Sequence, residues 1–248
     1  RFRLDRAFTP SPVPGTVGWL YDATNLDLDF LAAGERLSFS YTVTLRDNGL
    51  PQGATSEAVI FTIIGTNDAP VIDPGVQSAA LIEDTDVSLD GDLTAAGSIS
   101  FSDLDTTDVS LVTAAVSNLS VTSATGTLSS ALETALGSAF SISGDGVAPS
   151  APANAGTVEW GFAVGNALVQ YLAAGEVVEA VYTITVTDAN GGIDTRDVTV
   201  TITGLNSAPV AGTLADRQGF DHDLVTDLAL GAAFSDPDAG ATLTFGMA

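Results

Sequence analysis

The chain has 248 residues, with 7 Lys and Arg against 31 Asp and Glu, which gives a formal net charge of −24 at pH 7. It is 45% hydrophobic and only 15% charged. This is too apolar for a disordered acidic tail and indicates a folded protein with an acidic exterior. The charge would repel phosphate backbones and anionic lipid headgroups, which argues against nucleic-acid and membrane partners. The absence of Cys excludes disulfides, thiolate metal sites and cysteine nucleophiles.

No apolar run approaches the ~20 residues that a membrane-spanning helix needs. The opening residues, Arg1 to Asp5, are charged and do not resemble a signal peptide. Because there is no initial Met, we expect a processed piece or an excerpt of a longer chain.

Alternating polar and apolar residues predict β-strands along most of the chain. The clearest are Ser38–Leu45, Ala58–Ile64, Val178–Val186 and Val198–Ile202. One helix is predicted at Leu128–Leu136, with Thr127 as its cap, because Leu recurs every fourth residue there. Loops are expected at Thr9–Gly15 and Gly144–Gly156. These patterns predict an all-β fold of antiparallel β-sandwich repeats with one short helix.

The chain repeats itself. GTVGW at Gly15–Trp19 returns as GTVEW at Gly156–Trp160, FLAAGE at Phe30–Glu35 returns as YLAAGE at Tyr171–Glu176, and SYTVTLRD at Ser40–Asp47 returns as VYTITVTD at Val181–Asp188. The offset is 141 residues in each case, and it becomes 139 between GTNDAPV at Gly65–Val71 and GLNSAPV at Gly204–Val210. The phase of the repeat predicts one complete unit over residues 71–209, the back part of a unit over 1–70, and the front part of another over 210–248.

Signatures of catalysis are absent from the sequence, so we expect no enzyme. The single His, His222, stands among acids, and we interpret it as a solvated residue. The pair Glu159–Trp160 could suggest a sugar-cleaving carboxylate beside an aromatic platform. The other copy has Gly18 in place of Glu159, however, which favours a structural Trp in the core.

The acids gather at equivalent places in the repeat. FSDLDTTD carries Asp103, Asp105 and Asp108, while FSDPD carries Asp236 and Asp238. Carboxylates this close repel one another, and concentrating hard oxygen donors on turns is how a Ca²⁺ site is built. No local EF-hand explains them, because the loop that starts at Asp103 lacks its glycine and its final glutamate. Any site must therefore collect ligands from distant parts of the chain, and the alternative is solvated turns with Asp capping its own backbone.

GTNDAPV after an alternating strand, with YTVTLRD and LAAGE upstream, resembles the VCBS repeats of large secreted bacterial adhesins, including RTX-type ones, which are cadherin-like β-sandwiches. The resemblance implies domains stacked head to tail, Ca²⁺ at their junctions, an extracellular or bacterial cell-surface location, and a role in cell adhesion or biofilm. It also implies that the partners are neighbouring repeats of the same or an adjacent chain, with surface glycans or other cells as further candidates.

By the same resemblance, one junction around Val71 would use Asn67, Asp68, Asp103, Asp105 and Asp188, with Glu35. A second junction around Val210 would use Glu83, Glu176, Asn206, Asp236 and Asp238. Ser207 replaces the aspartate equivalent to Asp68, so the second junction should bind Ca²⁺ more weakly or hold fewer ions.

Two other functions stay open. The chain could be a carbohydrate-binding module with Trp19 or Trp160 as a platform, although equivalent positions in the repeat favour core roles for both. Alternatively, the partial units of two chains could complete one sandwich and build a head-to-tail extracellular filament. The partial units at the two ends would equally be explained if the sequence is an arbitrary excerpt of a longer chain.

Overall fold

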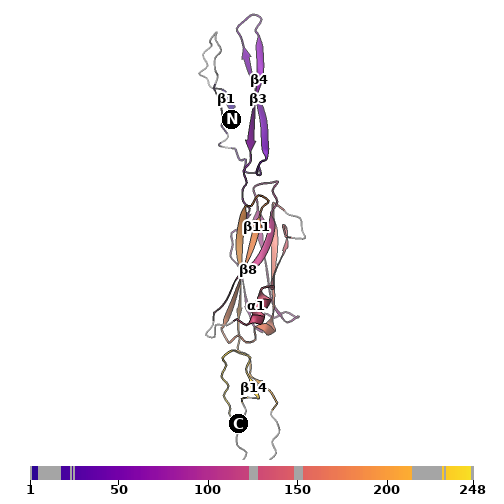
Figure 1. The fold of residues 1–248 in the computed structure, drawn as a ribbon, viewed down its shortest axis with the longest axis vertical. Coiled ribbons are helices and arrows are strands. Elements are labelled where there is room, and N and C mark those ends of the chain that lie inside the picture. Colours follow the sequence, from indigo (N-terminus) through magenta and orange to yellow (C-terminus); the bar gives the residue numbers. More distant parts are fainter. Residues whose placement is uncertain are drawn as a thin grey trace, which may run out of the picture.

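The protein is elongated, with a hairpin at one end, a β-sandwich in the middle and a short strand pair at the other end (Figure 1). The computed structural model describes residues 2–4, 18–22, 24, 26–122, 128–147, 153–213, 231 and 233–246. The predicted loop Thr9–Gly15, the cap Thr127 and His222 lie outside the described residues.

The hairpin pairs β3 (Arg36–Arg46) with β4 (Ala54–Ile64) in antiparallel register along their whole length. Both contain the strands predicted there. Beside it, β1 (Phe2–Leu4) pairs with β2 (Trp19–Tyr21). Phe61 of the hairpin packs edge-on against Trp19, with ring centroids 5.0 Å apart, and lies 5.6 Å from the Phe39 ring. An aromatic layer thus covers one face of the hairpin.

Two four-stranded sheets form the sandwich, in the orders β5-β7-β10-β9 and β6-β12-β11-β8. The strands of the first sheet are β5 (Val71–Ile72), β7 (Asp92–Ser102), β10 (Ala155–Gly165) and β9 (Phe140–Gly144). Those of the second are β6 (Gln77–Ile82), β12 (Ile193–Thr203), β11 (Val177–Thr187) and β8 (Leu111–Thr122). The all-β prediction is confirmed. The strands reach into both ends of the predicted loop Gly144–Gly156, because Gly144 ends β9 and Gly156 lies within β10.

One pair departs from the antiparallel expectation. β6 runs parallel to β12, with Gln77 opposite Val198 and Ile82 opposite Thr203. The chain leaves the first sheet after β5, crosses at Asp73–Val76 and joins the second sheet at its edge. Alternation predicts a strand but not the direction of its neighbour, so the sequence did not reveal this pair.

Strand alternation places the core. Every second residue of β11 is buried, with Tyr182 1% exposed and Ile184 fully buried. The Tyr182 hydroxyl donates to the Leu136 carbonyl oxygen at 2.7 Å, which satisfies the polar end of a buried ring. Tyr182 also stacks on Phe140, with centroids 4.5 Å apart. The core thus joins both sheets and the helix.

The helix is confirmed, with a later start and a different cap. α1 (Ser130–Leu136) begins after Ser129, whose hydroxyl accepts the Leu132 N–H at 3.2 Å. Leu132 and Leu136 are fully buried, as their spacing predicted. A short 3₁₀ helix, η1 (Asn166–Leu168), follows β10.

Trp160 is a core residue, as expected, and is only 4% exposed. Its indole N–H donates to the Gln77 side-chain oxygen at 3.1 Å. A Cβ at Gly97, its register partner on β7, would lie 2.5 Å from the indole ring, so the strand must carry glycine there. This burial removes Trp160 as a sugar platform. The core role predicted for Trp19 is wrong, because Trp19 is 53% exposed and packs on Phe61 of the hairpin rather than inside a closed sandwich.

At the far end, β13 (Val210–Ala211) pairs with β14 (Phe234–Ser235). Val210 faces Ser235, just as Val71 of β5 faces Ser102 of β7. The same local pairing therefore begins both segments.

Candidate metal centres at the repeat junctions

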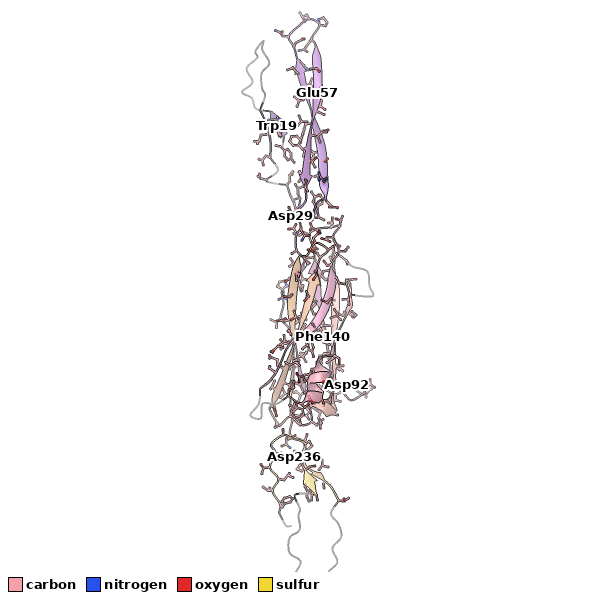
Figure 2. All side chains as sticks on the ribbon, viewed as in Figure 1. Trp19, Asp29, Glu57, Asp92, Phe140 and Asp236 are labelled. Carbon is pink, nitrogen blue, oxygen red and sulfur yellow. The ribbon has the colours of Figure 1, made fainter. Side chains whose placement is uncertain are left out.

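Acidic side chains gather where the hairpin meets the sandwich and where the sandwich meets the β13–β14 pair. Figure 2 shows Asp29 in the first of these necks and Asp236 in the second. We refer to them as the upper junction, around residues 65–71, and the lower junction, around residues 204–210.

Each junction begins with the same glutamate turn. In the upper one, Glu35 Oε2 accepts the Ala32 N–H at 3.1 Å, and the Glu35 carbonyl accepts the Gly65 N–H at 2.9 Å. In the lower one, Glu176 makes the equivalent bonds to Ala173 and Gly204 at 3.0 and 2.8 Å. The LAAGE motif therefore forms a tight turn closed by its own glutamate, and the backbone of that glutamate bonds the glycine that follows the next hairpin.

The linker then docks on the aspartates of the following segment. At the upper junction, the Asp68 N–H donates to Asp105 Oδ2 at 2.9 Å, and the Asp105 N–H donates to Asp103 Oδ1 at 3.0 Å. The Asn67 amide donates to the Asp68 carbonyl at 3.0 Å. Thus the structure brings together four residues that the sequence selected from two separate motifs.

The lower junction repeats this pattern of backbone hydrogen bonds. The Ser207 N–H donates to both Asp238 oxygens at 3.2 Å, and the Asp238 N–H donates to Asp236 Oδ1 at 3.0 Å. The Asn206 amide donates to the Ser207 carbonyl at 3.0 Å. Exchange of Asp68 for Ser207 keeps the backbone bond and removes one carboxylate.

Asp188 lies directly after β11 and reaches the upper junction, although it is 121 residues from Asn67 in the sequence. Its Oδ2 accepts the Asn67 amide at 2.9 Å, and its Oδ1 accepts the backbone N–H groups of Asn190 and Gly192, each at 2.8 Å. A Cβ on Gly192 would collide with this carboxylate and with Ala69, so the turn needs glycine.

Several oxygens in these junctions are buried without a partner. Asp105 is fully buried and Asp103 is 7% exposed, yet Asp105 Oδ1, Asp103 Oδ2 and Asn67 Oδ1 accept no hydrogen bond. At the lower junction, Glu83 is fully buried, and its Oε1 is likewise unpartnered, while Oε2 accepts the Leu205 N–H at 3.2 Å. A buried unpartnered carboxylate oxygen is costly, so each of these marks a place for a positive or donating group.

The pKa values of the buried aspartates at the upper junction are raised, which also indicates a site that is short of positive charge. Burial, and then the neighbouring charges of Asp105, Asp188 and Asp108, raise the pKa of Asp103. Burial, with the charges of Asp68, Asp108 and Asp188, raises the pKa of Asp105. Carboxylates with raised pKa values bind a proton or a cation more readily.

Two further carboxyl groups, those of Glu83 and Asp188, have pKa values that are shifted in opposite directions. Burial, followed by the charges of Asp84 and Asp238, raises the pKa of Glu83 from 4.5 to about 7. Burial alone would also raise the pKa of Asp188, but the Asn67 amide and the backbone N–H groups of its turn hold that pKa below its ordinary value. Asp188 is therefore a permanently charged member of the upper junction.

Sequence reasoning missed two contacts at the upper junction. The Thr107 hydroxyl donates to Glu35 Oε1 at 2.8 Å, which joins the hairpin segment to the sandwich. Asp108, 5% exposed, accepts the Asn190 side-chain amide. Both residues lie in FSDLDTTD, and Asp108 was already counted among the acids of that motif, but nothing in the sequence pairs Thr107 with Glu35 or Asn190 with Asp108.

The donor set fits Ca²⁺ in kind, since every candidate ligand presents oxygen, and the unpartnered junction oxygens belong to carboxylates, a side-chain amide and the Ser207 hydroxyl. The spacing is wider than a finished cage: within the described ranges, no three acidic or histidine side chains converge closely enough to hold a metal ion. A bound ion would therefore draw Asp103, Asp105 and Asp188 together and recruit Asn67 or backbone carbonyls.

In the part of the chain that the structure describes, no helix is long and apolar enough to cross a membrane. An open notch lies at the edge of β12, lined by residues that include Val76, Gln77 and Arg196.

No protein-family model matches the chain, and no curated protein matches it. Among solved structures, it is similar to CfaE, the adhesive subunit of the CFA/I fimbria of enterotoxigenic Escherichia coli, at 12% identity and a TM-score of 0.35 over 71% of this chain and 59% of that one. It is also similar to protocadherin gammaB7 EC3-6, at 14% and 0.33 over 82% and 43% of the two chains, and to the CooA pilin subunit of enterotoxigenic Escherichia coli, at 13% and 0.29 over 55% and 99%. At these identities and scores, none of the likenesses assigns a function, and membership of the VCBS repeats stays a hypothesis.

Proposed function

We propose that the chain is a non-catalytic, extracellular adhesion segment built from tandem cadherin-like repeats whose junctions are stiffened by Ca²⁺. The supporting observation is the backbone scaffold that the two junctions share, in each case beside a buried carboxylate with one oxygen that accepts no hydrogen bond. Catalysis needs no such duplication, whereas a periodic connector does. The proposal includes the division at residues 70/71 and 209/210 and a location on a bacterial cell surface.

Calcium would act by neutralising repulsion at the joints. Without a cation, the charge of Asp68 on the hairpin side of Val71 lies close to that of Asp105 on the sandwich side, and their repulsion favours separating the hairpin segment from the sandwich. With Ca²⁺ bound, ligands from both sides of Val71 share one ion, so bending the joint would break metal–oxygen contacts. Stiffness would then depend on free Ca²⁺.

Ser207 makes the two joints unequal. The lower junction has Glu83, Glu176, Asp236 and Asp238 as candidate ligands, but no counterpart to the Asp68 carboxylate. Affinity at oxygen sites rises with the number of charged ligands. We therefore expect the upper junction to fill first and the lower one to remain flexible at intermediate Ca²⁺.

The test combines calorimetric titration with small-angle X-ray scattering on the whole chain. We expect saturable Ca²⁺ binding and a more extended, narrower scattering profile with Ca²⁺ than with chelator. A ligand that binds only the folded state adds about 2.7 kcal/mol to the free energy of unfolding at 100-fold excess over its dissociation constant. No heat of binding, with identical profiles in both conditions, would refute the proposal.

A matched pair of variants separates the junction from general charge. Asp105→Asn and Glu159→Gln each remove one negative charge, but Glu159 is exposed in the middle of β10. Asp105→Asn should weaken binding and abolish the chelator-dependent change in scattering, while Glu159→Gln should change neither. Equal losses in both variants would assign the effect to net charge.

One observation favours a second candidate, a head-to-tail filament. Leu37 and Leu45 of β3 are 37% and 60% exposed, whereas their repeat equivalents Val178 and Val186 are 1% and 0% exposed. In the sandwich, the opposite sheet, which contains β5 and β7, covers this face, and β13–β14 is the counterpart of the β5–β7 pair. The β13–β14 segment of a second copy would cover the exposed face of the hairpin. Sedimentation over a wide concentration range tests it: growing assemblies support the filament, and a monomer throughout refutes it.

A further inference from the structure

The sandwich is threaded so that tension along the chain loads two parallel strands in opposite directions. The chain enters at β5 beside the upper junction and leaves after β12 at the lower junction (Figure 1). β6 and β12 run parallel over six register pairs, from Gln77 opposite Val198 to Ile82 opposite Thr203. Pulling the ends apart therefore draws β6 upward and β12 downward.

This geometry is shear. The hydrogen bonds between β6 and β12 lie across the direction of pull, so all of them share the load and must fail together. Strands pulled apart from the same end would instead lose their bonds one at a time. The side chain of Thr201 adds a bond to the ladder, since its hydroxyl donates to the Ala79 carbonyl at 3.3 Å.

A second contact lies upstream of this ladder and receives the load first. Ile72 of β5 is 1% exposed, and the Asp73 N–H donates to the Ser100 carbonyl of β7 at 2.9 Å. Adjacent residues of a strand point their backbone groups to opposite edges. The N–H and carbonyl of Ile72 therefore face away from β7, toward a side on which none of the described strands pairs with β5.

Two side chains of β12 occupy that edge. Asp194 Oδ2 accepts the Ile72 N–H at 2.7 Å, and Arg196 Nη2 donates to the Ile72 carbonyl at 3.4 Å. The Asp194 carboxylate accepts a hydrogen bond and the Arg196 guanidinium donates one, so together they replace the carbonyl and N–H that a neighbouring strand would offer. Arg196 is also the only basic residue in the sequence between residues 71 and 209. β12 thus holds β5 through side chains and β6 through its backbone.

We propose that Asp194 and Arg196 form a force-bearing clamp: they lock β5 to β12, so that tension between the junctions meets this lock before it reaches the β6–β12 ladder. The clamp needs no metal ion, so its test is independent of the calcium proposal. It gives the segment a second property, resistance to pulling, that stiff joints alone do not supply.

Single-molecule pulling of the whole chain in chelator tests the clamp. The absence of Cys allows thiol handles at any chosen position. Unfolding of residues 71–209 is identified by the chain length that it releases, about 500 Å at full extension. Loss of a hydrogen bond to a charged group should raise the unfolding rate of Asp194→Ala at a fixed force by about tenfold.

Asp197→Ala is the matched control, because Asp197 lies on the same strand and bonds Thr183 rather than β5. It should stay within about twofold of the unaltered chain. Arg196→Gln provides a second test should Asp194→Ala fail to fold, and its unfolding rate should also rise. Rates equal to that of Asp197→Ala in both clamp variants would overturn the proposal.

Pulling direction separates a clamp from ordinary destabilisation. Handles at Leu89→Cys and Leu205→Cys load only the chain between them, starting from the lower ends of β7 and β12, and they leave β5 and β6 outside the loaded stretch. Leu89 is fully exposed and Leu205 is 40% exposed. We expect lower rupture forces here than in end-to-end pulling, and no effect of Asp194→Ala. Equal forces in the two directions, or an equal effect of Asp194→Ala in both, would overturn the proposal.

Discussion

The stability of the metal-free protein should fall as pH rises, and Glu83 should cause most of the change. Below pH 4.5 this carboxyl group is protonated in both the folded and the unfolded chain. Above pH 7 it is ionised in both, and only the folded state bears a buried charge. Because the folded pKa is raised from 4.5 to about 7, the free energy of unfolding should drop by about 3 kcal/mol between these values.

Denaturant unfolding in chelator, measured from pH 5 to pH 8, tests this. Fluorescence of buried Trp160 reports on the sandwich, and a Trp19→Phe background removes the exposed indole. Glu83→Gln should flatten the pH dependence, whatever constant offset the amide introduces, because only the carboxyl group titrates. The raised pKa values of Asp103 and Asp105 act in the same direction as that of Glu83. An unchanged slope in Glu83→Gln, or a flat profile in the unaltered chain, would refute the reasoning.

The remaining predictions concern the core and the lower junction. Gly97→Ala should cost about 1–3 kcal/mol, because its Cβ would press on the Trp160 ring. Leu132→Ala, at a fully buried helix position, should cost about 2–5 kcal/mol. Thermal unfolding measures both, and a loss below 0.5 kcal/mol would contradict either estimate. Ser207→Asp should strengthen Ca²⁺ binding at the lower junction in calorimetric titration, and unchanged affinity would show that Asp68 is no ligand in the other copy.

Local pattern predicted the strands because side-chain alternation is itself the cause of a half-buried strand. Ser38–Leu45 and Val178–Val186 lie inside β3 and β11 for this reason. The helix was found from its buried leucines, but its first residue was not, because Ser129 and Thr127 are both acceptable caps and only the fold selects between them.

The candidate site was foreseeable where ligands share a motif. The repeat placed Asp103 and Asp105 at positions equivalent to Asp236 and Asp238. In the structure, the N–H of the second aspartate of each pair donates to Oδ1 of the first. Partners such as Asn190 were not foreseeable, because its contact with Asp108 joins residues that lie far apart in the sequence.

The sequence by itself determined the repeat, the all-β class and the acids that lie at the junctions, because these follow from spacing and alternation along the chain. Only the tertiary structure decided which carboxylate oxygens are buried without a hydrogen-bond partner, that β6 runs parallel to β12, and that Asp194 and Arg196 hold Ile72. The reason is physical: burial, strand direction and side-chain contact depend on what packs alongside a residue, and no local pattern encodes the identity of that neighbour. The net charge of −24 illustrates the division, since composition gives its size, while the fold concentrates part of it at the two junctions.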